Sequence, residues 1–132
     1  MARSSVPREY AEAIRKYAPQ VDGLARKRYG ISGAALLAKL LKGESGFRMN
    51  AVSPAGARGA AQFMPGSRRV AIQKFGVDPW RSPEEAVKGA VLHLLGKING
   101  KKGLEGYNPG GGQQYVRYIL KQPVGDVAGD VG

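Results

Sequence analysis

The sequence of 132 residues contains no cysteine, which excludes disulfide bonds, a thiol nucleophile and thiolate metal sites. Its one histidine, His93, is too little for a histidine-rich metal centre, and we expect it on the surface or in the core of a helix. No apolar run approaches the ~18 residues that a membrane span requires. The first twenty residues are charged and lack the apolar run of a signal peptide. We therefore expect a single domain that needs no metal and no cofactor.

A long segment also lacks acidic residues. Residues 45–77 contain no Asp and no Glu, although Glu44 stands directly before them. The polar side chains that this segment does supply include Ser45, Asn50, Ser53 and Gln62. Neutral hydrogen-bonding groups around one carboxylate suit an uncharged ligand rich in hydroxyls and amides, such as a sugar chain. A glycosidase with two catalytic carboxylates needs them about 5 to 9.5 Å apart, and this segment offers no partner for Glu44.

Positive charge, in contrast, is abundant and spread along the chain. The sequence has 21 basic and 10 acidic residues, which gives a net charge of +11. Such a charge favours any anionic polymer, whether nucleic acid, an anionic lipid surface or the bacterial cell wall. Composition alone does not choose among these partners.

Glu44 lies on the apolar stripe of a predicted helix. Leu37, Leu40, Leu41 and Glu44 recur at helical spacing, and Ser32 is placed to cap the start of this helix. A carboxylate at the end of an apolar face loses hydration, which favours its protonated form, and the negative end of the helix dipole acts in the same direction. These conditions suit a general acid near neutral pH. The alternative from spacing alone is a solvated glutamate at a helix end.

The remaining pattern predicts an all-α fold with, at most, one short hairpin. We expect helices over residues 8–18, 21–29, 32–44, 68–75, 82–99 and 115–120. Between the third and fourth helices we expect a loop with a hairpin at 51–58, then a helical turn over 59–64 that Pro65 ends. Trp80 is expected to anchor the core, with a sugar platform as the alternative. Residues 1–122 would form the domain, and residues 123–132 a flexible tail or linker.

Several spaced motifs resemble the soluble lytic transglycosylase (SLT) family. They are Glu44-Ser45-Gly46, then AVSPAGARG at residues 51–59, then Gln62-Phe63-Met64-Pro65, and later Tyr107-Asn108. The resemblance runs from about Ile31 to Leu120, and the order of several motifs makes it specific. It implies a lysozyme-like α fold and cleavage of the β-1,4 bond between N-acetylmuramic acid and N-acetylglucosamine. The products would carry a 1,6-anhydro ring because water does not take part.

The same resemblance implies roles for individual residues. Glu44 would be the single catalytic group, acting first as acid and then as base, and the substrate's own N-acetyl group would replace an enzymic nucleophile. The substrate would be bound by Ser45, Ser53, Gln62, Phe63, Met64, Tyr107 and Asn108. The chain departs from the family where Gly106 and Pro109 replace the alanines that commonly flank the Tyr-Asn pair.

Two other functions compete with this interpretation. One is a lysozyme-type hydrolase, in which water replaces the sugar hydroxyl. The other is a basic nucleic-acid-binding or glycan-binding module without activity, for which residues 56–59 supply a GxxG motif. For the favoured function we expect peptidoglycan strands as the partner, no nucleic acid, and a monomeric domain. We expect action in the bacterial cell wall or periplasm, after delivery in a virion or by a larger assembly such as a secretion system.

Overall fold

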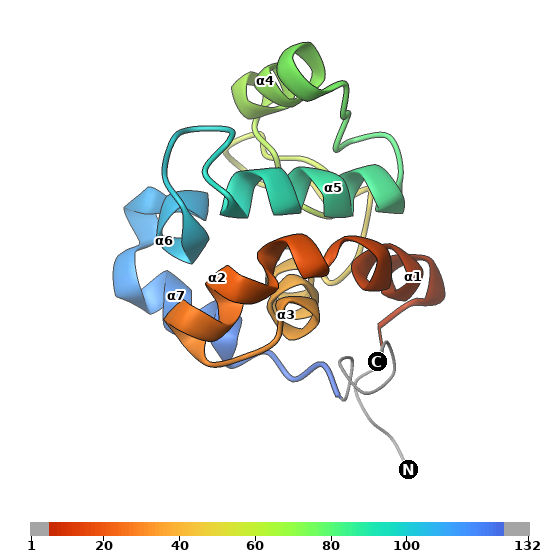
Figure 1. Cartoon of the computed structure of the whole chain (residues 1–132). Coiled ribbons are helices and arrows are strands. Elements are labelled where there is room, and N and C mark those ends of the chain that lie inside the picture. Colours follow the sequence, from red (N-terminus) through yellow and green to blue (C-terminus); the bar gives the residue numbers. More distant parts are fainter. Residues whose placement is uncertain (1–5, 126–132) are drawn as a thin grey trace.

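Residues 6–125, the part of the chain that this computed structural model describes, fold into short helices joined by turns (Figure 1). The elements are α1 (Arg8–Tyr17), α2 (Pro19–Tyr29), α3 (Gly33–Ser45), α4 (Pro65–Phe75), α5 (Pro83–Leu94), α6 (Gly103–Tyr107), the 3-10 helix η1 (Pro109–Gly111) and α7 (Gly112–Leu120). The predicted all-α class and single domain are confirmed.

Side-chain caps and left-handed glycines set many of the helix ends, among them the Ser32 cap that the sequence predicts. The Ser32 hydroxyl accepts the N–H of Ala35 at 3.0 Å, and the Ser82 hydroxyl accepts that of Glu85 at 3.2 Å. Glycines in the left-handed conformation close α2, α3 and α4: Gly30, Gly46 and Gly76. These local signals fix where the helix that carries Glu44 begins and ends.

Helix α3 is the centre of the core. Its leucines at 36, 37, 40 and 41 are all fully buried. Helix α2 packs on one side of α3, and α7 packs on another side of α3. Helix α1 packs on α5 (Figure 1). At Gly43 a Cβ would lie 2.6 Å from the Ile119 Cδ1, so the glycine allows α7 to approach α3 closely. The last turn of α3 is therefore enclosed on the side that faces α7.

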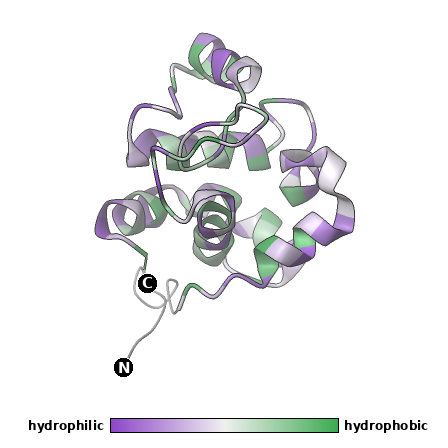
Figure 2. Ribbon diagram, turned by 180° about the vertical axis from the view of Figure 1, so that it is seen from behind, coloured by the Kyte–Doolittle hydropathy of each residue, from purple (hydrophilic) through white to green (hydrophobic). Residues whose placement is uncertain are grey.

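The segment between α3 and α4 forms an irregular hairpin. Arg58 forms isolated antiparallel bridges with both Val52 and Phe63, and no regular strand develops within this segment. The predicted helical turn over 59–64 is wrong: the chain reverses there, and Arg58 and Phe63 exchange N–H···O bonds of 3.0 and 3.1 Å. Seen from behind, this segment runs across the face of α5 (Figure 2). It forms one wall above the end of α3.

Several helix boundaries differ from the sequence prediction, and one helix is additional. Helix α4 begins at Pro65 rather than at residue 68, because proline fits the first helical position as well as it fits a helix stop. Helix α5 ends at Leu94 rather than Asn99, and the turn after it contains Gly96 at a φ of 81°. The short helix α6 was not expected at all. Helix α4 stands apart from the other helices (Figure 1).

The first residues of the predicted tail lie against the domain. Val124 is buried, and the Lys39 ammonium group donates to the carbonyl oxygens of Leu120 and Gln122 at 3.0 and 2.8 Å. The ordered chain therefore continues past residue 122, and residues 126–132 lie outside the described part. None of the helices within residues 6–125 has the length and apolar character of a membrane span.

Candidate active site

A pocket with a volume of about 310 Å³ opens at the C-terminal end of α3. It is lined by Glu44, Ser53, Ala55, Ala57, Gln62, Met64, Tyr107 and Asn108. The lining comes from α3, from the irregular hairpin and from the end of α6. Six of the eight predicted site residues are thus brought together, and Ser45 and Phe63 are the two that do not line the pocket.

Glu44 is the one carboxylate among the residues that line this pocket. Burial raises the pKa of Glu44 above its ordinary value, and a hydrogen bond from the Tyr115 hydroxyl to its Oε2 lowers the pKa by less. The position in the last turn of α3 adds the negative end of a helix dipole, which also favours the neutral acid. Burial and the helix dipole thus both favour the protonated form of Glu44, which is the form that a general acid needs.

Tyr115 is a hydrogen-bond partner of Glu44 that sequence reasoning missed. The hydroxyl of Tyr107, the tyrosine of the Tyr-Asn motif, donates to the carbonyl oxygen of Ala61 at 2.6 Å. The phenol that binds Glu44 comes instead from α7, where Tyr115 precedes the buried Val116 and Ile119. Burial, followed by the nearby charge of Glu44, raises the pKa of the Tyr115 hydroxyl, which therefore stays a donor. The available signal was a tyrosine on a helix face that packs inward, since a buried phenol needs a partner.

Ser45 and Phe63 shape the pocket from beneath, which corrects their predicted contact with substrate. Ser45 is 4% exposed; its hydroxyl donates to the Ala60 carbonyl oxygen at 2.8 Å and accepts the Arg48 N–H at 3.2 Å. Phe63 is 1% exposed and belongs to the core. Both side chains hold the hairpin against α3, so their effect on a ligand would act through the backbone that they position.

Gln62 presents an acceptor to the pocket. Its backbone has a φ of 53°, a conformation that L-residues rarely adopt, and its side-chain Nε2 donates to the carbonyl oxygens of Ala51 and Gly59 at 3.2 and 2.9 Å. Its amide protons therefore hold the hairpin together. Its Oε1 remains for a ligand. Ser53 is complementary, since its oxygen accepts the Ala57 N–H at 3.0 Å and its hydroxyl proton is available to donate.

His93 supports the Tyr107 wall from the core side. It is 7% exposed, its ring stacks on that of Tyr107 with centroids 4.3 Å apart, and Phe63 meets it edge-on. Burial lowers the pKa of His93, which favours the neutral imidazole. The core alternative for this histidine is therefore confirmed, with no direct place in the pocket.

The two departures around the Tyr-Asn pair have structural reasons. A Cβ at Gly106 would lie 2.1 Å from the Lys101 carbonyl oxygen, so the close path of the preceding turn requires glycine there. Pro109 begins η1, where its fixed φ suits the first helical position. Asn108, between these two turns, still lines the pocket.

Trp80 anchors the structure outside the pocket. Its indole N–H donates to the Phe63 carbonyl oxygen at 3.1 Å, and the Arg68 guanidinium lies 4.4 Å from its ring centroid. The side chain is partly buried against the core. The predicted contact with the core is confirmed, and Trp80 is not among the residues that line the Glu44 pocket.

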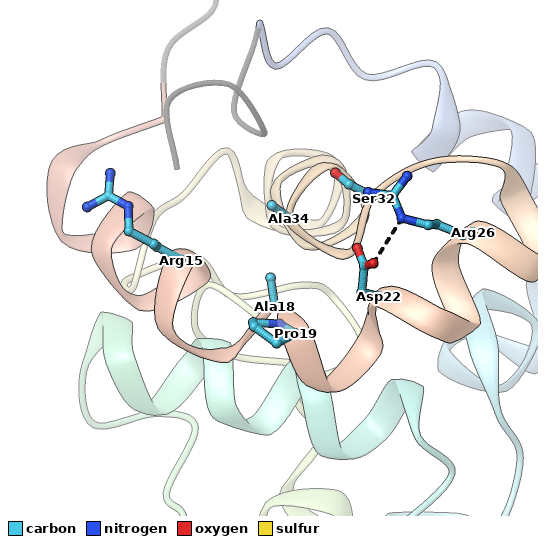
Figure 3. Close-up of a pocket in the computed structure, with 7 residues that line it drawn as sticks. All are labelled: Arg15, Ala18, Pro19, Asp22, Arg26, Ser32 and Ala34. Carbon is cyan, nitrogen blue, oxygen red and sulfur yellow. Dashed lines mark hydrogen bonds and ion pairs between the residues drawn. The ribbon is translucent and has the colours of Figure 1, made fainter. Parts of the chain in front are cut away.

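A different pocket, of about 380 Å³, lies at the opposite end of α3 (Figure 3). There the Asp22 carboxylate accepts from Arg26 at 2.9 Å and from the Gly33 N–H at 2.8 Å, and Ser32 caps the helix. These groups join α2 to α3 and are already satisfied by one another. The groups in this pocket connect two helices, whereas Glu44 at the other end of α3 faces a pocket as a single carboxylate.

Comparison with known proteins identifies similar chains. The family described as Transglycosylase SLT domain matches residues 23–118, a range that includes every residue lining the Glu44 pocket. Among solved structures, the 70 kDa soluble lytic transglycosylase Slt70 from Escherichia coli is similar over 80% of this chain and 20% of its own, with 19% identity and a TM-score of 0.45. The chain thus spans about a fifth of the length of that protein.

Proposed function

Because the chain belongs to the transglycosylase SLT domain family, we propose that it is a peptidoglycan lytic transglycosylase. It would cleave the β-1,4 bond between N-acetylmuramic acid and N-acetylglucosamine and leave a 1,6-anhydro end. The observation that supports this best is the pocket with a single carboxylate of raised pKa among neutral side chains. A protonated acid without a second carboxylate fits bond cleavage in which the substrate supplies its own nucleophiles.

In the first step, Glu44 gives its proton to the glycosidic oxygen as the bond from that oxygen to C1 of the muramyl sugar breaks. The acetamide oxygen of the same sugar bonds to C1 and spreads the positive charge over the acetamide group. Tyr115 would hold the carboxyl in place and, as a donor, would stabilise the carboxylate that forms. Proton transfer of this kind typically contributes ~10²–10⁴-fold in rate.

In the second step, the C6 hydroxyl oxygen of the muramyl sugar attacks C1 and opens the acetamide ring. The hydroxyl proton passes to the Glu44 carboxylate, which restores the starting acid. No water is consumed, and the two new ends are the anhydro sugar and the free hydroxyl of the glucosaminyl sugar. One side chain therefore serves as acid and then as base.

The neutral lining is suited to orienting this substrate. The Ser53 hydroxyl would donate and the Gln62 Oε1 would accept from sugar hydroxyls or an acetamide, while Asn108 can do both. Met64 is 42% exposed and offers an apolar surface beside the acid. Tyr107 would shape the wall rather than move protons, since its hydroxyl is already bound to the Ala61 carbonyl oxygen. The residues of one chain complete the pocket, so we propose that a monomer suffices.

Digestion of purified peptidoglycan, followed by mass analysis of the fragments, tests this function. We expect products one water lighter than hydrolytic fragments, without a reducing end at the muramyl sugar. Reducing-end products alone would instead establish a lysozyme-type hydrolase. Release of no fragments by folded protein would point to a module that binds without activity. Assays of virions and of secretion assemblies for this chain test the proposed routes to the cell wall.

A further inference from the structure

A second groove, lined by cations, lies at the junction of α2 with the turn that leads into α6. Its volume is about 610 Å³, and its charged residues are Lys27, Arg28, Lys97 and Lys102 over the apolar side chains Leu24 and Leu95. No carboxylate lines it. Helix α2 lies towards the viewer in Figure 1, whereas the hairpin over the Glu44 pocket faces the viewer from behind in Figure 2. A ligand in this groove would therefore leave the pocket open.

The lysines of this groove are available to a ligand. Within residues 6–125, the ammonium groups of Lys27, Lys97 and Lys102 form no ion pair, and all three side chains are exposed. Arg28 differs, since its guanidinium donates to the Lys102 carbonyl oxygen at 3.2 Å and lies 3.7 Å from the Glu105 carboxylate. The arginine thus joins the two walls, and the three lysines supply unbalanced positive charge.

The walls are built to stay in this arrangement. The Tyr29 hydroxyl donates to the Glu105 carboxylate at 2.6 Å and accepts the Leu104 N–H at 2.8 Å, which fastens the end of α2 to α6. A Cβ at Gly103 would lie 2.7 Å from both the Arg28 Nη1 and the Tyr29 hydroxyl, so glycine is needed for this approach. A groove that is already formed binds its ligand with less loss of conformational freedom.

The turn that carries two of the lysines is held in the same way. The Asn99 side chain donates to the Gly106 carbonyl oxygen at 2.9 Å and accepts the Lys101 N–H at 3.0 Å. Gly96 has a φ of 81°, and a Cβ there would lie 3.0 Å from the Lys102 Cγ. These contacts bring Lys97 and Lys102, five residues apart in sequence, to one side of the groove. The backbone positions of these two lysines are therefore fixed.

We propose that this groove binds a phosphodiester-linked polyol polymer attached to the cell wall, and so holds the enzyme on its substrate. The choice of a cell-wall polymer as the ligand rests on the proposed function. The positive charge of the groove is observed independently of that function. Lysine ammonium groups act as point charges that suit a row of phosphates in a flexible chain. Single-stranded nucleic acid would instead call for aromatic side chains on which bases stack, and none lines this groove.

The test measures binding of the full chain to purified poly(glycerol phosphate) by calorimetry over a range of salt concentrations. All proteins carry Glu44→Gln, so that binding is separated from cleavage. The groove variant adds Lys27→Gln, Lys97→Gln and Lys102→Gln. Its matched control adds Arg69→Gln, Lys74→Gln and Lys121→Gln, which removes the same charge from exposed positions outside the groove. Thermal unfolding verifies that both variants are folded.

We expect the groove variant to bind at least about tenfold more weakly than the control, with a slope of log K against log salt that is shallower by about 2. Equal losses in both variants would overturn the proposal, because binding would then follow net charge alone. Equal or tighter binding of single-stranded DNA or polyglutamate would also overturn it. Without Glu44→Gln, the groove variant should cleave wall stripped of phosphate polymers as fast as the control does; this rate reports the proposed function separately.

Discussion

The two ends of helix α3 hold carboxylates whose pKa values are shifted in opposite directions. At the N-terminal end, Asp22 accepts the Gly33 N–H and the Arg26 guanidinium, and these bonds, the first being the larger cause, lower its pKa. At the C-terminal end, Glu44 has the Tyr115 hydroxyl as its hydrogen-bond donor, and burial raises its pKa. The helix dipole reinforces both effects, since it favours negative charge at the first end and opposes it at the second. At one end of the helix the shift in pKa favours the ionised carboxylate that joins α2 to α3, and at the other end it favours the protonated form.

The largest expected effect is the loss of activity when Glu44 becomes glutamine. Glu44→Gln keeps the shape of the side chain but cannot give or take the proton, so the release of soluble fragments from peptidoglycan should fall by ~10²–10⁴-fold. The measurement is the initial rate of fragment release with purified walls. The corresponding acid-to-amide substitution at the N-terminal end of α3 is Asp22→Asn. It keeps the hydrogen bond from the Gly33 N–H and should leave the rate within about twofold. Full activity of folded Glu44→Gln protein would remove Glu44 from its role.

The next largest effect is on the free energy of unfolding, when the glycines near the two ends of helix α3 are replaced. A Cβ at Gly33 would lie 2.5 Å from the Ala18 carbonyl oxygen, which is backbone, whereas one at Gly43 would meet the flexible end of Ile119. We therefore expect Gly33→Ala to lower the free energy of unfolding by about 3 kcal/mol and Gly43→Ala by about 1 kcal/mol. Chemical denaturation measures both. Gly23→Ala is the control, because it has open space and should be neutral or stabilising. An equal loss for Gly33→Ala and Gly43→Ala would contradict this account of the packing.

A smaller effect on activity should follow the loss of the Tyr115 hydroxyl, which donates to Glu44. Tyr115→Phe removes the hydrogen bond that lowers the pKa of Glu44, so the pKa should rise further and the carboxyl should lose its fixed position. We expect the maximal rate to fall roughly tenfold. Since the first step needs the protonated acid, the alkaline limb of the pH profile should move to higher pH.

The control for this variant lies on the same helix. The Tyr118 hydroxyl donates to the Gly43 carbonyl oxygen at 3.1 Å from an exposed position, so Tyr118→Phe should change neither the rate nor the profile. A Tyr115→Phe profile that moves to lower pH would show that the phenol does not act on the acid as described.

The smallest effect is on stability as a function of pH. The folded pKa of Glu44 is raised above the ordinary 4.5, so the folded state holds the proton more tightly than the unfolded state does. The resulting stability is fully present below the ordinary pKa and is lost as pH rises through the folded pKa. The loss is about 1.4 kcal/mol for each pH unit that separates the folded pKa from the unfolded one. The wild type should therefore lose stability relative to Glu44→Gln over that interval, as thermal unfolding at several pH values would show. A constant difference between the two proteins would contradict the raised pKa.

Local signals in the sequence were sufficient for much of the fold. The Ser32 cap was predicted correctly because a cap acts on its own few residues of backbone. Pro65 was misassigned because proline suits both the position after one element and the first turn of the next. Helix α6 was missed since its five residues have too few turns to show a periodic pattern, and its contacts with α2 come from distant residues.

The difference between local signals and contacts from distant residues also applies to the site. Sequence placed Glu44 at the end of an apolar face because its neighbours on α3 determine that position. It gave Ser45 and Phe63 direct roles because a motif does not show which of its residues turn inward. Tyr115 lies 71 residues from Glu44 in sequence, and only the packing of α7 on α3 brings the two together. The residues that hold an acid in place belong to the tertiary structure, and single-sequence patterns do not reach them.

The most direct test of the central claim is a titration of the side-chain carboxyl carbons of Glu44 and Asp22 by NMR. Signals are assigned by comparison with Glu44→Gln and Asp22→Asn. We predict that Glu44 titrates above its ordinary value of 4.5, while Asp22 titrates below its ordinary 3.8. A Glu44 pKa at or below 4.5 would show that burial does not favour the protonated acid and would contradict the account.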